Sequence, residues 1–181
     1  MKRIAIDMDE VIADFNTKMI PSFNSRFNAQ IKLADLDGMT IQQLRPDIKQ
    51  QVEEMIGEAD FFADLAVIPQ SQRVIKKLTE RYEVFITTAA MEFPLSFNAK
   101  FRWLTQHFPF IHPMNIVFCG NKSILHADYL IDDNARHFAH FTGEGILFSA
   151  PHNKHVSGYR RVNSWLEIEA MFITDQEAGA K

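Results

Sequence analysis

Short apolar runs alternate along the chain with longer stretches in which apolar residues recur at helical spacing. The runs are rich in β-branched and aromatic residues and are bounded by turn-forming residues, which is typical of strands. Strands and helices that alternate in this way predict an α/β fold with a parallel sheet. The five predicted strands are Arg3–Asp9, Glu83–Thr88, Asn115–Cys119, Tyr129–Ile131 and Ile146–Phe148.

The segment between the first two strands contains no strand-like run. We expect Pro21 to kink or split its first helix, and we expect a turn at Asp37-Gly38 and a helix from Arg45 to about Phe62. A parallel crossover needs only a dozen or so residues, so about fifty helical residues here predict a cap. The expected division is a core of residues 1–12 and 69–181 and a cap of residues 13–68. The apolar face of the first helix consists of Phe15, Met19, Phe23 and Phe27.

From Pro69 onward, helices and strands alternate regularly. We expect Ser71 to be the N-cap of a helix that extends to about Tyr82, and a second helix over residues 97–108. Ser164 and Glu167 have the spacing of a capping box and predict the start of the last helix. The tail, residues 176–181, is expected to be mobile.

The composition narrows the classes of protein to consider. The chain has 181 residues, 46% of them hydrophobic, which is enough for one domain with a sizeable core. Its net charge of −4 argues against binding to polymeric nucleic acid or to a membrane surface. No apolar run approaches the ~20 residues that span a bilayer, and no secretory signal is evident. The one cysteine, Cys119, cannot form an internal disulfide, so a cytoplasmic protein is expected.

Four of the predicted strands are followed by polar residues of a particular kind. In order they supply Asp7 and Asp9, Thr88, Lys122, and Asp132 with Asp133. Each has an ordinary explanation alone, because Asp favours turns, Thr favours strands and Lys is common in loops. The carboxyl ends of parallel strands meet at one edge of a sheet, where ligands bind, so we expect these side chains to meet.

Together these residue types suit phosphoryl transfer through an aspartyl-phosphate. A carboxylate can attack phosphorus, while a divalent cation such as Mg²⁺, which prefers oxygen ligands, screens it from the anionic substrate. A hydroxyl and an ammonium can stabilise the equatorial oxygens. A second carboxyl two residues further on can protonate the leaving group and then activate water.

These motifs resemble those of haloacid-dehalogenase-like (HAD) phosphatases, and within them the 5′(3′)-deoxyribonucleotidase branch. The superfamily resemblance lies in Asp7-Met8-Asp9, Thr88, Lys122 and Asp132-Asp133, and it covers most of the chain from Arg3 to Asn134. It implies a three-layer α/β core with strand order 3-2-1-4-5 and a helical cap inserted after strand 1. Further matches to the branch are Ala13-Asp14-Phe15, Leu44-Arg45-Pro46, Phe61-Phe62 and Ala127 to Asp133.

The resemblance also implies a role for each matching residue. Asp7 would be the nucleophile and Asp9 the general acid and base, with Thr88 and Lys122 holding the phosphate. The Mg²⁺ ligands would be Asp7, the main-chain carbonyl of Asp9, and Asp133, supported by Asp132. The substrate would be a nucleoside monophosphate in a pocket walled by Phe15, Phe61 and Phe62.

Three positions depart from the family pattern. Glu10 stands where the family usually has Gly, and its side chain is expected to narrow the loop or to add charge beside the metal. Ala89 stands where the family has a Ser that contacts phosphate. Met39 and Thr40 stand where mammalian members have an aromatic pair that stacks on the base. The choice of base is therefore open, whereas phosphomonoester hydrolysis is expected.

Other functions stay open from the sequence alone. They are a HAD-type phosphatase of another small phosphomonoester such as a sugar phosphate, a non-catalytic nucleotide-binding protein, and a receiver-like signalling module. A homodimer is also left open. The pairs His137/His140 and His152/His155 are interpreted as solvent-facing residues or as core residues with satisfied hydrogen bonds, because no Cys or Glu partner lies at zinc spacing.

Overall fold

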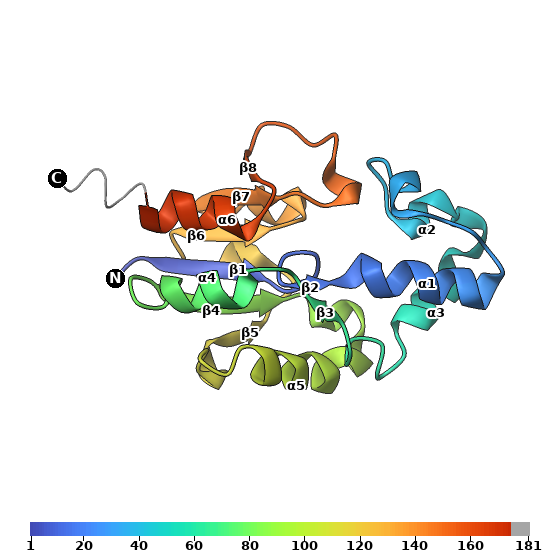
Figure 1. The fold of residues 1–181 in the computed structure, drawn as a ribbon, viewed down its shortest axis with the longest axis horizontal. Helices are drawn as coiled ribbons and strands as arrows, with labels where there is room; N and C mark the ends of the chain where they lie inside the picture. The colour runs from blue at the N-terminus through green and yellow to red at the C-terminus, as the bar shows by residue number, and fades with distance from the viewer. Residues whose placement is uncertain (175–181) are drawn as a thin grey trace.

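A six-stranded parallel sheet forms the centre of the molecule in a computed structural model that describes residues 1–174 (Figure 1). The expected mobile tail, residues 176–181, lies outside the described residues. The strand order is β5-β4-β1-β6-β7-β8, and every neighbouring pair is parallel. The strands are β1 (Arg3–Asp7), β4 (Glu83–Thr88), β5 (Ile116–Phe118), β6 (Tyr129–Asp132), β7 (Glu144–Phe148) and β8 (Arg160–Val162).

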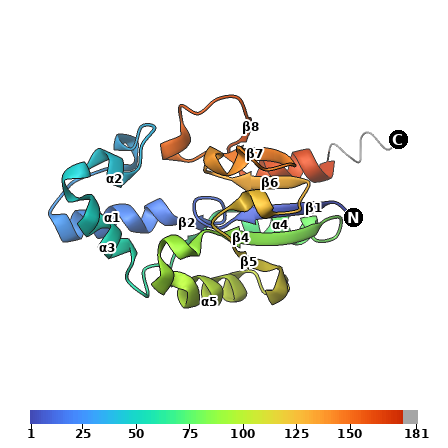
Figure 2. The same ribbon diagram turned by 180° about the vertical axis from the view of Figure 1, so that it is seen from behind.

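The sheet is buried on both faces, which explains why its central strands have almost continuous apolar sequences. Ile4 and Ile6 of β1 belong to the larger apolar cluster, whereas Ala5 between them belongs to a smaller cluster on the opposite face. Helices α4 (Ser71–Leu78) and α6 (Trp165–Glu169), which contact each other, pack on the larger cluster. Helix α5 (Phe97–His107) lies at the β5 end of the sheet in both ribbon views (Figures 1 and 2).

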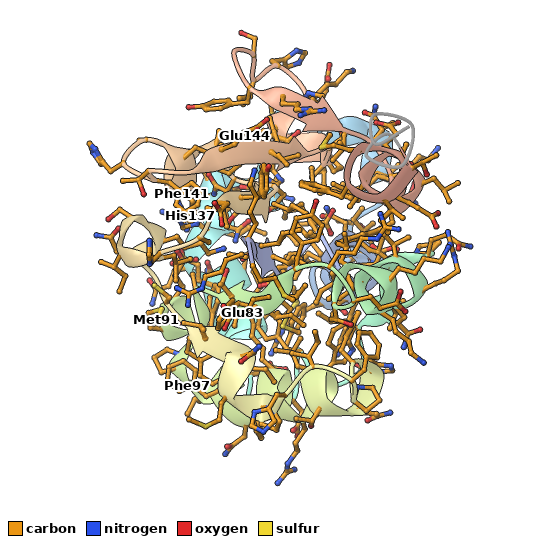
Figure 3. All side chains as sticks on the ribbon, turned by 90° about the vertical axis from the view of Figure 1, so that its left-hand side faces the viewer. Glu83, Met91, Phe97, His137, Phe141 and Glu144 are labelled. Atoms are coloured by element: carbon orange, nitrogen blue, oxygen red, sulfur yellow. The ribbon has the colours of Figure 1, made fainter. Side chains whose placement is uncertain are left out.

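Figure 3 views the sheet from the left-hand side of Figure 1, so that the β5 side and the β7 side of the strand order are seen apart. Met91 and Phe97 lie at the β4–β5 end, and His137 and Phe141 lie at the β6–β7 end. Within residues 1–174, every helix is too short or too polar to span a bilayer.

The helical insert follows β1 and is joined to the core by a two-stranded antiparallel ribbon of β2 (Ala13–Asp14) and β3 (Ala66–Val67). Its helices are α1 (Phe15–Phe27), α2 (Ile41–Leu44) and α3 (Lys49–Ile56), with 3₁₀ turns η1 (Leu33–Asp35) and η2 (Pro46–Ile48). The insert, called the cap below, projects beyond the carboxyl ends of the strands (Figure 1).

Several sequence predictions about the elements were wrong in detail. Helix α1 continues through Pro21 without being split, although a kink there stays a prediction, and α3 ends before Gly57 instead of extending to Phe62. Gln70, in the left-handed region at φ 69°, is the N-cap of α4, whereas the Ser71 hydroxyl donates back to the Ile68 carbonyl. The ribbon β2–β3 and the edge strand β8 were not predicted.

The capping box of the last helix was predicted correctly in part. The Ser164 hydroxyl accepts from the backbone N–H of Glu167, as expected of an N-cap. The Glu167 carboxylate, however, accepts from the backbone N–H of Asn163, one residue earlier than a standard capping box requires. Helix α6 then continues as a π-helical turn over Ala170–Thr174.

Candidate active site

Four neighbouring strands bring the predicted polar residues to one edge of the sheet. Asp7 ends β1, Thr88 ends β4, Lys122 begins the 3₁₀ turn η6 (Lys122–Ile124) after β5, and Asp132 ends β6. All four side chains are buried, with exposed fractions of 7% for Asp7 and 1% or less for the other three. These strands occupy adjacent places in the sheet, so residues far apart in the sequence share one site.

Lys122 is the centre of the floor of this site. Its ammonium donates to the Asp7 carboxylate and, at 2.5 Å, to the Asp132 carboxylate. Burial opposes the charge on Lys122, but the two carboxylates outweigh it and raise the pKa of the ammonium above its ordinary value. Lys122 therefore stays charged and fixes both carboxylates in place.

Three carboxylates on this floor form a group that could hold a metal ion. Asp7, Asp132 and Asp133 each offer an oxygen, and these oxygens lie within 4.8 Å of one another. Burial, together with the neighbouring carboxylates, raises the pKa of Asp7 to about 7 against the opposing charge of Lys122. Burial, followed by the charges of Asp132 and Asp7, raises the pKa of Asp133 well above its usual range.

These raised pKa values reflect an excess of buried negative charge. One ammonium, Lys122, faces the three carboxylates, and a divalent cation would relieve the remaining repulsion. Carboxylate oxygens are also the donors that hard divalent cations prefer. The residues present therefore fit a divalent metal ion.

Asp9 lies apart from this group and faces Lys100. The Lys100 ammonium donates to the Asp9 carboxylate and, at 3.1 Å, to the Thr88 hydroxyl. It also lies 4.2 Å from the centroid of the Phe62 ring. The other carboxylate oxygen of Asp9 is buried and has no hydrogen-bond partner among the described residues. The role of the Asp9 main-chain carbonyl as a metal ligand stays a prediction.

Lys100 is a residue of the site that sequence reasoning missed. Its side chain is almost fully buried, on the face of α5 that also carries Trp103 and Leu104. Trp103 and Leu104 follow Lys100 by three and four residues, so all three lie on the apolar face of the helix. An unpaired charge on that face is costly. That position in the pattern was the available signal.

A cavity of about 220 Å³ lies above the carboxylates, between the core and the cap. Of the predicted pocket residues, Phe15, Met39, Thr40, Phe62 and Ala89 line it. Phe61 does not line this cavity: it packs against Phe15 and Phe62, with ring centroids 5.7 and 5.4 Å away. Thus the cap contributes an apolar and aromatic wall over a charged floor.

Another part of the cavity lining is polar and was not predicted. It contains Glu92, Arg136, His137 and His152, of which Glu92 and Arg136 form an ion pair. His152 is neither solvent-facing nor a simple core residue, because its Nε2 lies 3.2 Å from the carbonyl oxygen of Asp133 and 3.3 Å from its carboxylate.

Glu10, the departure beside the second aspartate, also lines the cavity. It adopts φ 57°, in the left-handed region that favours glycine. Its carboxylate accepts from the backbone N–H of Asn16 at 2.8 Å, and burial raises its pKa to about 7. Glu10 is also among the charges that raise the pKa of Asp133, so it adds negative charge beside the carboxylate group.

Comparisons with known proteins agree with this chemistry. The sequence profile of the family described as "5' nucleotidase, deoxy (Pyrimidine), cytosolic type C protein" matches residues 1–178. A "Putative 5'(3')-deoxyribonucleotidase" of Staphylococcus aureus (strain Mu50) is 46% identical over 176 residues, which cover 97% of this chain and 98% of that protein. A "5'(3')-deoxyribonucleotidase" of Bacillus subtilis is 40% identical over 172 residues, covering 95% and 99%.

A solved structure supports the fold. A putative HAD-hydrolase of Bacillus subtilis, determined bound to magnesium, superposes with a TM-score of 0.58 at 10% identity. The superposition covers 95% of this chain and 98% of that one. The architecture is therefore HAD-like.

Proposed function

Because this chain belongs to the 5′ nucleotidase, deoxy (pyrimidine), cytosolic type C family, and is thus a phosphoric monoester hydrolase that acts on nucleotides, we propose that it dephosphorylates (deoxy)nucleoside monophosphates with Mg²⁺. The observation that carries the proposal is the buried group of Asp7, Asp132 and Asp133 around Lys122, directly beneath a cavity with an aromatic wall. With a divalent cation bound, the floor would suit a phosphate, and the apolar wall suits a nucleoside.

The core, residues 1–12 and 69–181, would carry the chemistry, and the cap, residues 13–68, would select the substrate. Asp7, Asp133 and the Asp9 carbonyl would hold Mg²⁺, with Asp132 in support. Bound there, the ion would neutralise the carboxylates and polarise the phosphoryl group. Lys122 has two of its three N–H donors committed to carboxylates, and the third would bind a phosphate oxygen.

In the proposed reaction the Asp7 carboxylate attacks phosphorus and the bond to the leaving oxygen breaks. Asp9, in its protonated form, donates a proton to that oxygen, and the nucleoside departs as an alcohol. Asp9 then takes a proton from water, which attacks the aspartyl-phosphate, releases inorganic phosphate and restores Asp7. Thr88 and Lys100 face Asp9 and would contact the phosphate from the other side.

The base would lie against Phe15, Phe62 and Met39, without the aromatic pair that mammalian members have at the positions of Met39 and Thr40. Ala89 leaves only its backbone to contact the phosphate. A cytoplasmic location and a homodimer stay predictions.

Phosphate release with Mg²⁺ tests the proposal on dUMP, dTMP, dGMP, UMP, a nucleoside 3′-monophosphate and several sugar phosphates. We expect turnover of nucleotides and none by Asp7→Asn, whose fold is checked by circular dichroism. Hydrolysis of sugar phosphates alone would retain the chemistry and contradict the nucleotide assignment. Full activity in Asp7→Asn would contradict the nucleophile. Aspartyl-phosphate that persists for minutes would favour the signalling alternative.

A further inference from the structure

The loop between β7 and β8 lies between the cap and the carboxylate group. It contains a short 3₁₀ turn, η8 (Pro151–Asn153), and it approaches the cap near α2 in both ribbon views (Figures 1 and 2). Residues 151–155, called the strap below, contact Asp133 on one side and the cap turn Asp37-Gly38 on the other.

Asn153 makes the contact to Asp133. Its amide nitrogen donates to the carbonyl oxygens of Asp133 at 2.7 Å and Phe148 at 2.8 Å. Its amide oxygen accepts from Arg161 at 2.7 Å and from the backbone N–H of Ala150 at 3.2 Å. The side chain is 1% exposed, and these four bonds use its full capacity. A buried amide held in this way has one orientation, and it fixes the backbone that carries the Asp133 carboxylate.

The cap contact is made at Gly38. Its backbone N–H donates to the Pro151 carbonyl at 3.0 Å. Gly38 has φ 78°, and a Cβ at this position would lie 2.3 Å from Cδ2 of His155. Asp37 also pairs with Lys154 at 2.7 Å and His155 at 3.2 Å, but all three side chains are more than half exposed, so these pairs contribute little. The backbone hydrogen bond therefore joins the strap to the cap, and the His155 ring lies against Gly38 beside it.

We propose that Asn153 is a positioning residue for Asp133. Through the strap, the position of the cap turn at Gly38 then influences the position of the Asp133 carboxylate. The inference rests on the proposed function, in which Asp133 is a metal ligand. Residues that orient metal ligands typically change metal affinity or activity by about 10- to 100-fold when they are substituted. A displaced strap should therefore weaken metal binding even in the absence of substrate.

The first test is Asn153→Asp, which keeps the shape of the side chain and removes both N–H donors. Asn24→Asp is the matched control, because Asn24, on helix α1 of the cap, makes a similar pair of bonds to the backbone of Ile31. The measurement is the affinity of metal-free enzyme for Mn²⁺, followed by electron paramagnetic resonance without substrate. We expect about tenfold weaker binding in Asn153→Asp and wild-type affinity in Asn24→Asp.

The second test is Gly38→Ala, with Gly158→Ala as the control. Both glycines have positive φ, so alanine costs similar backbone strain at both positions, but a Cβ at Gly158 meets nothing within 4 Å. We expect Gly38→Ala to raise KM for nucleotide and to weaken Mn²⁺ binding several-fold. The reason is that displacing the strap would disturb the hydrogen bond from Asn153 to the backbone of Asp133. This pair also keeps the proposal testable if Asn153→Asp does not fold.

Wild-type Mn²⁺ affinity in Asn153→Asp would overturn the positioning role. Unchanged Mn²⁺ affinity in Gly38→Ala would overturn the coupling to the cap. A wild-type enzyme that releases no phosphate from any nucleotide, but whose Mn²⁺ binding is still weakened by both substitutions, would contradict the nucleotidase proposal and support the strap.

Discussion

Two buried lysines divide the polar residues of the site into two sets. Lys122 holds Asp7 and Asp132, whereas Lys100 holds Asp9 and the Thr88 hydroxyl. The proposed nucleophile and the proposed acid, two residues apart in the sequence, are thus oriented by cations from different parts of the chain. In the proposed reaction, this separation would let one carboxylate face phosphorus while the other serves the leaving group.

Replacing Lys100 with Met tests the second set. The substitution keeps the length of the side chain, but it leaves Asp9 and Thr88 without their buried donor. We expect kcat for a nucleoside monophosphate to fall about 100-fold, the scale of general acid–base catalysis. The control is Lys77→Met, which removes an exposed lysine paired with Glu169 on the surface. A loss of less than threefold in a folded Lys100→Met enzyme would rule out this role for Lys100.

Glu10 allows a pH prediction. Its pKa is raised from 4.5 to about 7 in the folded protein, so the native state holds a proton that the unfolded chain has already released. The stability that this proton confers is complete below pH 4.5 and is lost as the pH rises through 7, by about 3 kcal/mol. We expect Glu10→Gln, in metal-free protein, to lose less stability than wild type between pH 5 and 8.

Urea unfolding at both pH values measures this difference. Asp7 and Asp133 titrate in the same direction, so the variant should keep part of the dependence. Identical pH dependence in the variant and the wild type would show that the Glu10 carboxyl is not desolvated in solution.

At the scale of elements, two tryptophans from core helices hold the junction between core and cap. Trp103 of α5 donates to the Leu65 carbonyl just before β3, and Trp165 of α6 donates to the Val11 carbonyl just before β2, both at 2.8 Å. Both indoles are almost fully buried. The two chain crossings into the cap are therefore fixed by the core, and this places Phe15, at the start of α1, over the carboxylates.

Trp165→Phe should loosen one of these crossings. The Val11 carbonyl would lose its buried donor and a cavity would remain, so we expect a loss of about 2–4 kcal/mol in the free energy of unfolding. Amide hydrogen exchange should accelerate locally over residues 11–14. Leu166→Ala, on the exposed side of the same helix, is the control. Unchanged exchange in Trp165→Phe would show that the ribbon does not depend on this bond.

The elements also show what the sequence could reveal. Buried parallel strands have continuous apolar sequences, so β1, β4 and β6 could be located, and with them the positions of Asp7, Thr88 and Asp132. The ribbon β2–β3 has two residues in each strand, too few for a pattern, and β8 is a polar edge strand. The helical pattern marked Lys100 only as a charge on the apolar face of α5 and did not name its partners. His152 reaches the site through packing between distant segments, which periodicity along the chain does not encode.

At the scale of the whole molecule, the cap and the core enclose a cavity whose floor carries excess negative charge. In a protein that already has a net charge of −4, this charge opposes folding until a cation neutralises it. Stability and metal binding should therefore be linked. A ligand that binds only the native state stabilises it by about 2.7 kcal/mol when its concentration is 100 times its Kd.

We therefore expect Mg²⁺ to raise the Tm of the metal-free enzyme at pH 8 and to raise it much less at pH 5. At pH 5 protons occupy Asp7 and Asp133, whose pKa values are raised, and they compete with the ion for the same oxygens. Thermal unfolding with and without Mg²⁺ at both pH values measures the effect, and Asp133→Asn should abolish it. An equal rise in Tm at both pH values, or one that survives in Asp133→Asn, would mean that the ion stabilises the protein from another place and that the buried carboxylates are not its site.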